Sequence, residues 1–466
     1  MSKTRVVTAN ALDHLTEIVG ASHVLVDDDL RAGYEVDWTR RFRGRAAAVV
    51  RPADTHEVAA LVEWAIEHRV ALVPQGGNTG LVGGGVPSAA APNTTAPNTC
   101  VVVSLRRLDS IGALDGAAGQ ITVGAGVALA SLQRTIAGTG WSFGVDLGAR
   151  DSATIGGMVA TNAGGVRVLR HGAMRAQTLG VEAVLGDGSV ISHLGGLVKD
   201  NTGYDIAGLL CGSEGTLGIV TAARLRLVSD PPDRVVVVAG LPDVRTAVEV
   251  AARLRAEVDG LDALEATLGG AADLCCAQLG LVPPFDPMLP VLLLAEWAGQ
   301  GGPPDAFADA LADWPTAAAD DGRGRAALWA PRDRMSEAIA RLGVAHKLDV
   351  TLPLAHLAEF ATRVGPLVDD AHPGATVILF GHLGDGNVHV NVVGPAPDDE
   401  AVDHVVLGLV ARYDGSISAE HGIGQAKTRW LHLCRTPTEI AAFRRIKTAF
   451  DPSAIMNPGV LLTVDG

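Results

Sequence analysis

One segment of the C-terminal half, residues 381–391, reads GHLGDGNVHVN and concentrates side chains that could bind a metal. If Asp385-Gly386 is the two-residue turn of a β-hairpin, His382 and His389 face each other across its strands. Their Cβ atoms would then lie roughly 5 Å apart, close enough for both imidazoles to bind one ion. Asn391, two residues after His389, would project to the same face. The segment therefore predicts two nitrogen ligands and a nearby amide.

A second segment, residues 418–424, reads SAEHGIG and supplies the acidic group that such a site needs. Glu420 would add a hard oxygen donor beside the two imidazoles and leave a coordination position open for a substrate. His421 is then not needed as a metal ligand. A single histidine is more often an ordinary core or surface residue, but four groups of these types within glycine-rich turns favour a shared site.

Two glycine-rich loops of the N-terminal half could hold an anion. Residues 74–85 read PQGGNTGLVGGG and residues 152–165 read SATIGGMVATNAGG. Because glycine has no Cβ, several backbone N–H groups can converge on phosphate oxygens, and asparagine and threonine add side-chain donors. One such loop alone could equally be an ordinary surface loop. Two loops of the same composition favour a cradle for a dinucleotide pyrophosphate.

Another glycine pair, Gly124 and Gly126, follows a strand-like run and precedes a helix, as in the fingerprint of nicotinamide-binding proteins. Leu129 stands where that fingerprint has its third glycine, and its side chain would block the close approach of helix and strand. We therefore predict a packing turn here and no nicotinamide site.

The elements around these loops predict an α+β domain over about residues 45–228. Asp54, with Glu57 three residues further on, is a typical N-cap and predicts a helix that runs through His68. The Gly186-Asp187-Gly188 turn predicts a hairpin. Residues 91–99, APNTTAPNT, form a low-complexity near-repeat that we expect to be a disordered surface insertion. Strands are expected at 47–50, 71–74, 101–104, 121–123 and 181–185.

Residues 230–233, Asp-Pro-Pro-Asp, mark the expected start of a second domain, because consecutive prolines can continue neither a helix nor a central strand. Strands are expected at 235–240, 291–294 and 345–352, a hairpin at 381–393, and helices ending near 258, at 326–342 and in three closing segments. The predicted division is a helical lead-in (1–43), a first domain (44–229), a second domain with the metal site (230–435) and a C-terminal helical segment that returns to the first domain (436–466).

Composition limits the class of protein. A chain of 466 residues favours two or three domains. Its net charge of −15 and its lack of a Lys/Arg-rich block argue against nucleic acid as a partner. The 5 cysteines show no C-x-x-C spacing, which favours free thiols in a reducing compartment such as the cytoplasm. We also expect no signal peptide and no membrane span, since apolar runs are short.

The glycine loops and the GSEGTLGIV stretch at 212–220 resemble those of the FAD-linked oxidases of the vanillyl-alcohol oxidase or para-cresol methylhydroxylase type. The resemblance covers nearly the whole chain and implies a two-part N-terminal FAD-binding domain followed by an α+β substrate domain with an antiparallel sheet and C-terminal helices. It implies FAD contacts at Pro74, Gln75, Gly76, Gly77, Asn78, Thr79, Gly80, Leu81, Asp146, Ser152, Thr154, Gly156, Gly157, Asn162, Gly164, Gly165, Glu214, Gly218, Ile219 and Asn457.

The sequence departs from this family at three positions. Covalent members carry a flavin-linking histidine in the first loop, where this chain has Asn78, so the FAD is expected to be dissociable. Gln75 stands where arginine is common, and His171 stands where tyrosine is usual. FAD is the predicted cofactor despite these differences.

The two histidine segments are similar to those of the D-2-hydroxyacid dehydrogenase branch of that family. The resemblance implies that His382, His389 and Glu420 bind zinc or manganese and that His421 is the catalytic base. The chemistry agrees with these roles. The C2 hydroxyl must lose its proton when hydride leaves C2 for the flavin, and a metal on the substrate oxygens stabilises the resulting charge. A neutral imidazole with a pKa near 6.5 can accept that proton.

Two further segments bear on the substrate. In a helix over 326–342, Arg332 and Ser336 would lie on one face at i and i+4, and Lys347 follows in the next strand. The stretch resembles the D-2-hydroxyglutarate dehydrogenases, in which the matching groups hold the distal carboxylate. The resemblance therefore implies a 2-hydroxy dicarboxylate substrate, with Arg332, Ser336, Lys347 and Asn391 as its contacts. Without it, Arg332 and Lys347 could equally be solvated surface charges.

Other functions stay open at this stage. A D-lactate or glycolate dehydrogenase of the same branch is the main alternative. A flavin-binding electron-transfer subunit with a purely structural metal is a more distant one. The family implies an electron-transfer flavoprotein or a quinone as electron acceptor. The sequence leaves the oligomeric state open, a homodimer included.

Overall fold

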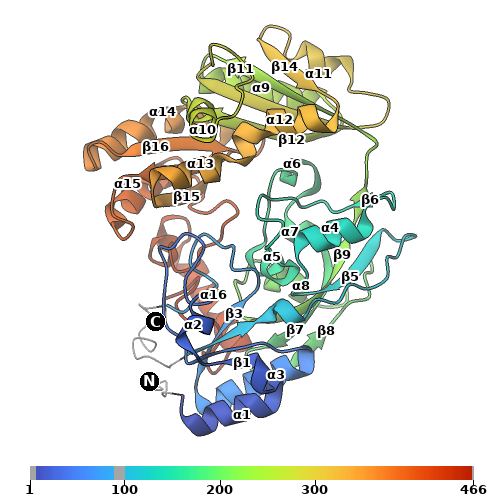
Figure 1. Cartoon of the computed structure of the whole chain (residues 1–466), viewed down its shortest axis with the longest axis vertical. Coiled ribbons are helices and arrows are strands. Elements are labelled where there is room, and N and C mark those ends of the chain that lie inside the picture. The colour runs from blue at the N-terminus through green and yellow to red at the C-terminus, as the bar shows by residue number, and fades with distance from the viewer. Residues whose placement is uncertain (1–6, 89–99, 464–466) are drawn as a thin grey trace. The chain divides into compact units, whose positions relative to one another are not determined.

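The computed structural model describes residues 7–88 and 100–463, which divide into two compact units. Unit 1 comprises Met1–Gly164, Gly172–Ser229 and Glu420–Gly466, and unit 2 comprises Gly165–His171 and Asp230–Ala419 (Figure 1). The low-complexity segment 91–99 lies outside the described residues. The α+β class predicted from the sequence is confirmed. The return to unit 1 begins at Glu420, earlier than the predicted residue 436.

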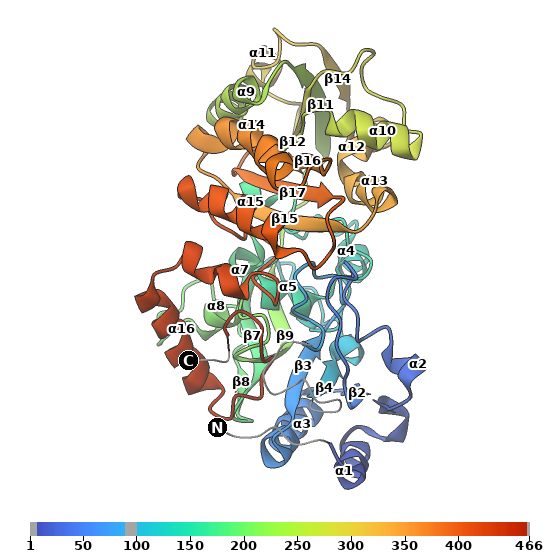
Figure 2. The same cartoon turned by 90° about the vertical axis from the view of Figure 1, so that its left-hand side faces the viewer.

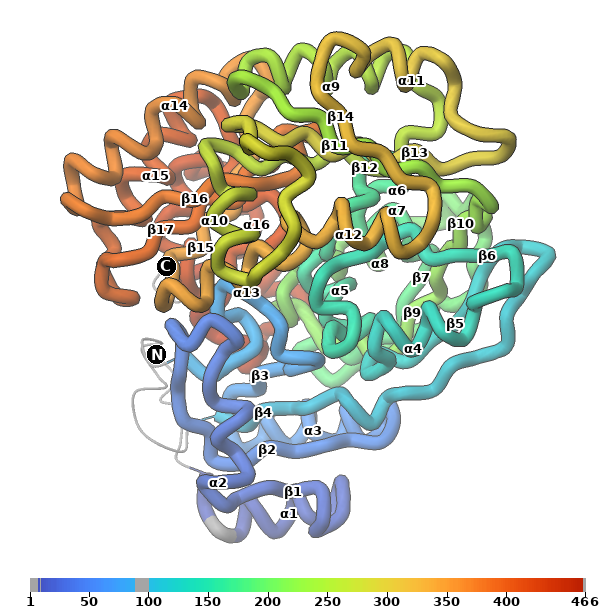
Figure 3. The backbone as a smooth tube through the Cα atoms, turned by 45° about the horizontal axis from the view of Figure 1, so that its top comes forward, coloured from blue at the N-terminus to red at the C-terminus, as the bar shows by residue number. Residues whose placement is uncertain are grey.

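The first sheet of unit 1 has the strand order β1-β2-β4-β3, in which β1 pairs antiparallel with β2 and the other two pairs are parallel. Figure 3 draws these strands in shades of blue. Its core includes the buried side chains of α1 and α3. Helix α3 begins after Asp54, whose carboxylate accepts a hydrogen bond from the backbone N–H of Glu57 at 2.9 Å, as predicted. The elements are α1 (Ala9–Val19), η1 (Ala21–His23), β1 (Val24–Leu25), α2 (Asp28–Arg31), β2 (Ala48–Val50), α3 (Thr55–His68), β3 (Ala71–Gln75), β4 (Cys100–Ser104) and η2 (Leu105–Arg107).

The second sheet of unit 1 is antiparallel, with the order β5-β9-β7-β8. The predicted hairpin turn at 186–188 joins β7 to β8. Strand β5 pairs antiparallel with β9, and the turn at Gly124 is closely packed, as predicted: a Cβ on Gly124 would lie 2.2 Å from the Leu108 carbonyl oxygen. The elements are β5 (Gln120–Gly124), α4 (Leu129–Ile136), β6 (Trp141–Ser142), α5 (Ile155–Thr161), α7 (Met174–Gln177), β7 (Thr178–Leu185), β8 (Val190–Ser192), α8 (Ile206–Leu210), β9 (Gly218–Arg226) and β10 (Val228–Ser229).

Unit 2 is built on a fully antiparallel sheet with the order β14-β11-β13-β12-β16-β17-β15. Helices α9, α14 and α15 cover one face, and α10, α12 and α13 cover the other (Figure 2). The elements are α6 (Val168–His171), β11 (Asp233–Leu241), α9 (Val244–Glu257), β12 (Leu261–Leu268), α10 (Ala271–Leu279), β13 (Val291–Gly299), α11 (Asp305–Asp309), β14 (Thr316–Ala319), α12 (Gly322–Asp333), α13 (Met335–Leu342), β15 (Ala345–Thr351), α14 (Leu354–Ala371), β16 (Thr376–Gly381), β17 (Asn387–Val393) and α15 (Glu400–Arg412).

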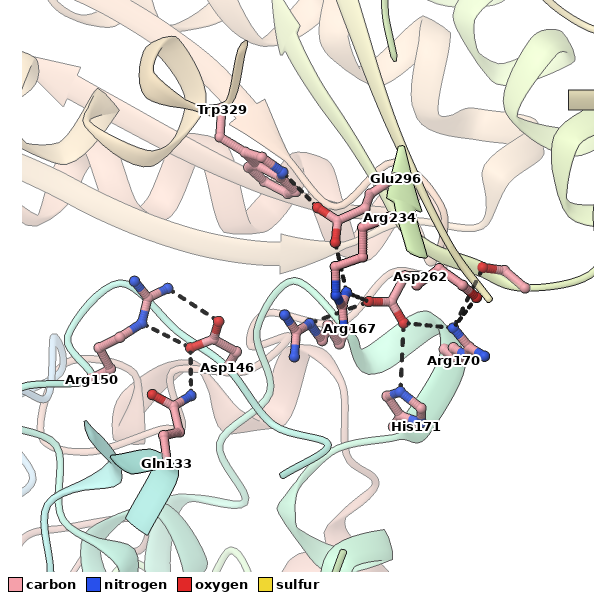
Figure 4. Close-up of polar contacts among 12 residues, drawn as sticks. Gln133, Asp146, Arg150, Arg167, Arg170, His171, Arg234, Asp262, Glu296 and Trp329 are labelled. Carbon is pink, nitrogen blue, oxygen red and sulfur yellow. Dashed lines mark hydrogen bonds and ion pairs between the residues drawn. The ribbon is translucent and has the colours of Figure 1, made fainter. Parts of the chain in front are cut away.

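The segment Gly165–His171 belongs to unit 2 although its sequence neighbours belong to unit 1. It is held by Asp262, a carboxylate that is 1% exposed and sits at a bulge of β12 (Figure 4). Arg167 and Arg170 reach this carboxylate at 3.3 and 3.1 Å, and Arg234 of β11 reaches it at 2.7 Å. Burial by itself raises the pKa of Asp262, but a hydrogen bond with His171 and the charges of Arg167 and Arg234 bring that pKa below its usual range.

The C-terminal return segment contains η3 (Thr428–Leu433) and α16 (Pro437–Phe450). Helix α16 starts with a complete capping box between Thr436 and Glu439, and its Ile446 and Phe450 pack against the core of the second sheet. Within residues 7–88 and 100–463, no helix combines the length and the apolar character needed to cross a bilayer.

Candidate active site

The two predicted glycine loops meet in unit 1. A Cβ on Gly76 would lie 2.2 Å from the hydroxyl oxygen of Thr154, and a Cβ on Gly77 would lie 1.9 Å from the carbonyl oxygen of Ser152. Any other residue at these two positions would push the loops apart. The structure thus explains the Gly-Gly pair by close packing of one loop on the other.

The Thr154 hydroxyl lies at this junction. It is buried, and within the described part of the chain it has no hydrogen-bond partner. A buried hydroxyl without a partner costs about 1–3 kcal/mol, so such a group calls for an acceptor. A phosphate oxygen would satisfy it, and the cradle therefore fits a dinucleotide such as FAD.

Two predicted contacts in the first loop use their side chains to shape the loop. The Gln75 amide donates to the carbonyl oxygens of Tyr34 and Gly85 at 3.0 and 2.7 Å. The Asn78 amide donates to that of Val36 at 2.9 Å, and the residue has a left-handed φ of 55°. The Gln75 amide is therefore engaged with backbone carbonyl oxygens. The rest of the loop, Thr79, Gly80 and Leu81, is partly or fully exposed.

Three predicted contacts around the second loop also have protein partners. The Asp146 carboxylate accepts from Arg150 at 2.9 Å and from Gln133 at 3.1 Å (Figure 4). Asn162 ends α5 with a φ of 49° and accepts from the backbone N–H of Arg175 at 2.8 Å. Gly156 packs on Ala125, because a Cβ on it would lie 2.5 Å from that side chain.

Glu214 holds the loop that contains the second histidine motif. Its buried carboxylate accepts from the backbone N–H groups of Ile423 and Gly424 at 2.8 and 2.7 Å. Burial raises the pKa of Glu214, and the two hydrogen bonds oppose that rise. The Asn457 amide donates to the carbonyl oxygen of Glu214 at 2.7 Å and to that of Gly84 at 2.8 Å. Glu214 therefore ties the return segment to the 212–220 stretch, and Asn457 ties it to the first glycine loop as well, roles that the sequence did not reveal.

The hairpin of unit 2 exists, but the predicted register is wrong. His389 pairs with Phe380, and residues 382–386 form the connection between β16 and β17. The N–H groups of Asp385 and Asn387 both approach the carbonyl oxygen of His382, which makes a wider turn than the two-residue one predicted. The rings of His382 and His389 are nevertheless close, with centroids 5.4 Å apart.

Each of these histidines has a buried carboxylate beside its Nδ1 atom. Glu265 Oε1 lies 2.6 Å from Nδ1 of His382, and Asp349 Oδ1 lies 3.4 Å from Nδ1 of His389. Metal-binding histidines are commonly oriented in this way by a carboxylate. The donor set therefore fits a divalent metal. The sequence reasoning missed both carboxylates, since acidic residues are usually exposed and Glu265 lies far from the motif in the chain.

Asp349 also anchors the chain just before the second motif. Its Oδ1 accepts from the Asn387 amide at 2.7 Å, and its Oδ2 accepts from the backbone N–H of Ala419 at 3.0 Å. Glu420 follows Ala419 by one peptide bond and is the first residue of the return segment. The imidazole of His421 lies 3.7 Å from the Glu420 carboxylate.

The predicted substrate contacts divide into two groups. The Lys347 ammonium donates to the Asn391 amide oxygen at 3.3 Å, and burial lowers the pKa of Lys347 to about 8. Arg332 instead forms an ion pair with Glu265 at 2.6 Å. The predicted single helix is wrong: α12 ends at Asp333 and α13 begins at Met335, so Arg332 and Ser336 do not share one helix face.

Two family profiles match the chain. The profile described as "FAD binding domain" matches residues 46–193, and the one described as "FAD linked oxidases, C-terminal domain" matches residues 230–461. The second match extends from the start of unit 2 into the return segment, so it includes both histidine motifs.

Curated relatives and solved structures agree with these profiles. A D-2-hydroxyglutarate dehydrogenase of Xanthomonas citri pv. viticola is 37% identical over 444 residues, which cover 92% of each chain. A putative mitochondrial D-lactate dehydrogenase of Schizosaccharomyces pombe is 32% identical over 95% of this chain and 88% of its own. The crystal structure of p-cresol methylhydroxylase with substrate bound has a TM-score of 0.78 at 16% identity, covering 98% of this chain and 97% of its own. The predicted two-part flavin-binding fold is therefore confirmed.

Proposed function

The chain belongs to the FAD-linked oxidase family, and on that premise we propose that it oxidises D-2-hydroxyglutarate to 2-oxoglutarate with the help of a divalent metal. The glycine loops would hold FAD, which would supply the acceptor for the hydride that leaves C2 of the substrate. His382, His389 and Glu420 would hold zinc or manganese, which supplies a Lewis acid toward the substrate oxygens. His421 would accept the proton of the C2 hydroxyl.

The observation that carries this proposal is the position of Lys347 on the sheet. His389 and Asn391 lie on one face of β17, and their partners on β15 are Asp349 and Lys347. The partly buried ammonium therefore lies two residues, or roughly 7 Å, along the strands from the His389 pair. That spacing suits a substrate whose hydroxyl end is at the histidines and whose second carboxylate is at Lys347.

Replacing Lys347 by alanine tests the substrate class. The loss of a charge-assisted hydrogen bond, worth roughly 1.5–3 kcal/mol, should raise KM for D-2-hydroxyglutarate about 10- to 150-fold. KM for D-lactate should change little, because that substrate has no second carboxylate. Steady-state kinetics with both substrates measure the effect, and Lys199→Ala, which removes an exposed lysine of unit 1, is the matched control. Equal losses for both substrates in K347A would refute the dicarboxylate assignment.

The Lys347 ammonium should also make the preference for D-2-hydroxyglutarate over D-lactate depend on pH. Its positive charge is present below a pKa of about 8 and is lost as the pH rises through that value. The kcat/KM for the dicarboxylate should therefore fall above about pH 8 relative to that for D-lactate.

A D-lactate or glycolate dehydrogenase is the second candidate, and the name of the Schizosaccharomyces pombe relative favours it. A wild-type enzyme that prefers a monocarboxylate would select it. Bleaching of the flavin in the isolated chain by any of these substrates would exclude a mere electron-transfer subunit. An electron-transfer flavoprotein or a quinone is the proposed acceptor. Four of the 5 cysteines, Cys100, Cys211, Cys275 and Cys276, are buried, as expected for thiols in the predicted reducing compartment.

We expect the FAD to be bound without a covalent link. No histidine lies in residues 74–85, and the Asn78 amide is bonded to a backbone carbonyl of the lead-in. Acid or heat precipitation should leave intact FAD in the supernatant, where absorbance and chromatography identify it. Yellow colour that stays with the precipitated chain would contradict this expectation.

A further inference from the structure

Glu265 joins two groups that the proposed function treats separately. One carboxylate oxygen lies 2.6 Å from Nδ1 of His382, and the other lies 2.7 Å from Nε and 2.6 Å from Nη2 of Arg332. The residue is 1% exposed and lies on β12, between β13 and β16 in the sheet. We propose that Glu265 is a positioning residue that fixes His382 for the metal and uses Arg332 as its counter-ion; this inference rests on the proposed metal-dependent function.

The hydrogen bond to Nδ1 decides which nitrogen of His382 can bind a metal. A carboxylate at this distance keeps the proton on Nδ1, so the lone pair for coordination lies on Nε2. It also limits rotation of the ring about its bond to Cβ. Glu265 therefore determines both the tautomer and the direction of the predicted ligand.

Arg332 completes the arrangement on the other side of the carboxylate. A buried carboxylate without a counter-ion would be costly, and the ion pair with Arg332 removes that cost. The guanidinium lies over the ring of Phe380 at 4.8 Å, and that ring lies 4.9 Å from the ring of His389. Arg332 thus supports both histidines. Because the charge of Arg332 is paired with Glu265, Lys347 is the main cation for a substrate carboxylate.

The structure offers a matched control. Glu296 of β13 also fastens α12, because it accepts from the indole N–H of Trp329 at 2.7 Å (Figure 4). Its other partner is Arg234, at 2.8 Å. Glu296→Gln therefore weakens the attachment of the same helix without removing the group that faces His382. If Glu265 only held α12 in place, Glu265→Gln and Glu296→Gln would weaken zinc binding equally.

The experiment measures metal binding by the holoenzyme. Wild type, Glu265→Gln and Glu296→Gln are equilibrated at a series of buffered free zinc concentrations, and bound zinc per chain is read by mass spectrometry, with FAD content and Tm in parallel. We expect roughly 10- to 100-fold weaker zinc binding in E265Q alone, with FAD retained. Wild-type zinc affinity in E265Q, or an equal loss in E296Q, would overturn the proposal.

A second variant covers the case in which E265Q does not fold. Glu265→Asp keeps the negative charge, but its side chain is one methylene shorter and cannot reach both His382 and Arg332 as glutamate does. We again expect weaker zinc binding. Unchanged zinc binding in this variant would overturn the proposal. The outcomes also separate this inference from the proposed function. A wild-type chain that binds no zinc or manganese refutes the metal site itself. Equal binding in wild type and variant refutes only the positioning role.

Discussion

Replacing His421 by alanine is expected to slow flavin reduction by roughly 10²- to 10⁴-fold, the usual contribution of a general base, while D-2-hydroxyglutarate still binds. The substitution removes the proton acceptor and no predicted carboxylate contact. It also leaves the loop anchored, because Glu214 holds that loop through the backbone N–H groups of Ile423 and Gly424. Anaerobic stopped-flow absorbance gives the reduction rate and, from its dependence on substrate concentration, the affinity.

The control is His432→Ala, which removes an exposed imidazole from the same return segment. It should reduce the flavin at the wild-type rate. Two results would count against His421 as the base. One is a variant that reduces flavin as fast as wild type. The other is a loss of affinity that accounts for the whole loss of rate.

Removal of the metal is expected to have an effect of at least similar size. Lewis-acid stabilisation of charge on the substrate oxygens is worth several kcal/mol, so chelation should slow flavin reduction by about 10³-fold or more. FAD should stay bound, because none of its predicted contacts is a predicted metal ligand. Added zinc or manganese should restore the rate.

The variant Glu420→Ala should reproduce the loss and should resist rescue by added metal. Metal content, flavin absorbance and the rate of reduction are measured on the same samples. Full activity in metal-free protein would remove the metal from the mechanism and leave the flavin and the base. Loss of FAD together with the metal would instead show that the two sites are not independent.

The parts of the fold that the sequence predicted are those with a clear local pattern. Strands β2, β3, β4, β5 and β7 lie at the short apolar runs where they were expected, and α3 begins at its expected cap. The two glycine loops could be recognised because their composition is unusual. Their contact at Gly76 and Gly77 could not, since it depends on tertiary packing.

The parts that the sequence did not predict depend on buried charge and on loop geometry. Strand β12 reads LDALEATL and is buried along its whole length, yet its Asp262 and Glu265 would ordinarily mark an exposed surface. Their partners are distant in the chain, so no local pattern reveals them. The hairpin register failed for another reason: a Gly-Asp-Gly sequence is compatible with both a short and a longer connection.

The segment Gly165–His171 has a consequence for the modularity of this enzyme. A fragment that begins at Asp230 would lack Arg167, Arg170 and His171 and would leave the Asp262 carboxylate with Arg234 alone. Truncating the chain at residues 230–233 would therefore destabilise the Asp262 carboxylate, which lies on the same strand, β12, as Glu265. Transfer of unit 2 to another flavoprotein, by recombination or by design, would have to bring the segment Gly165–His171 with it.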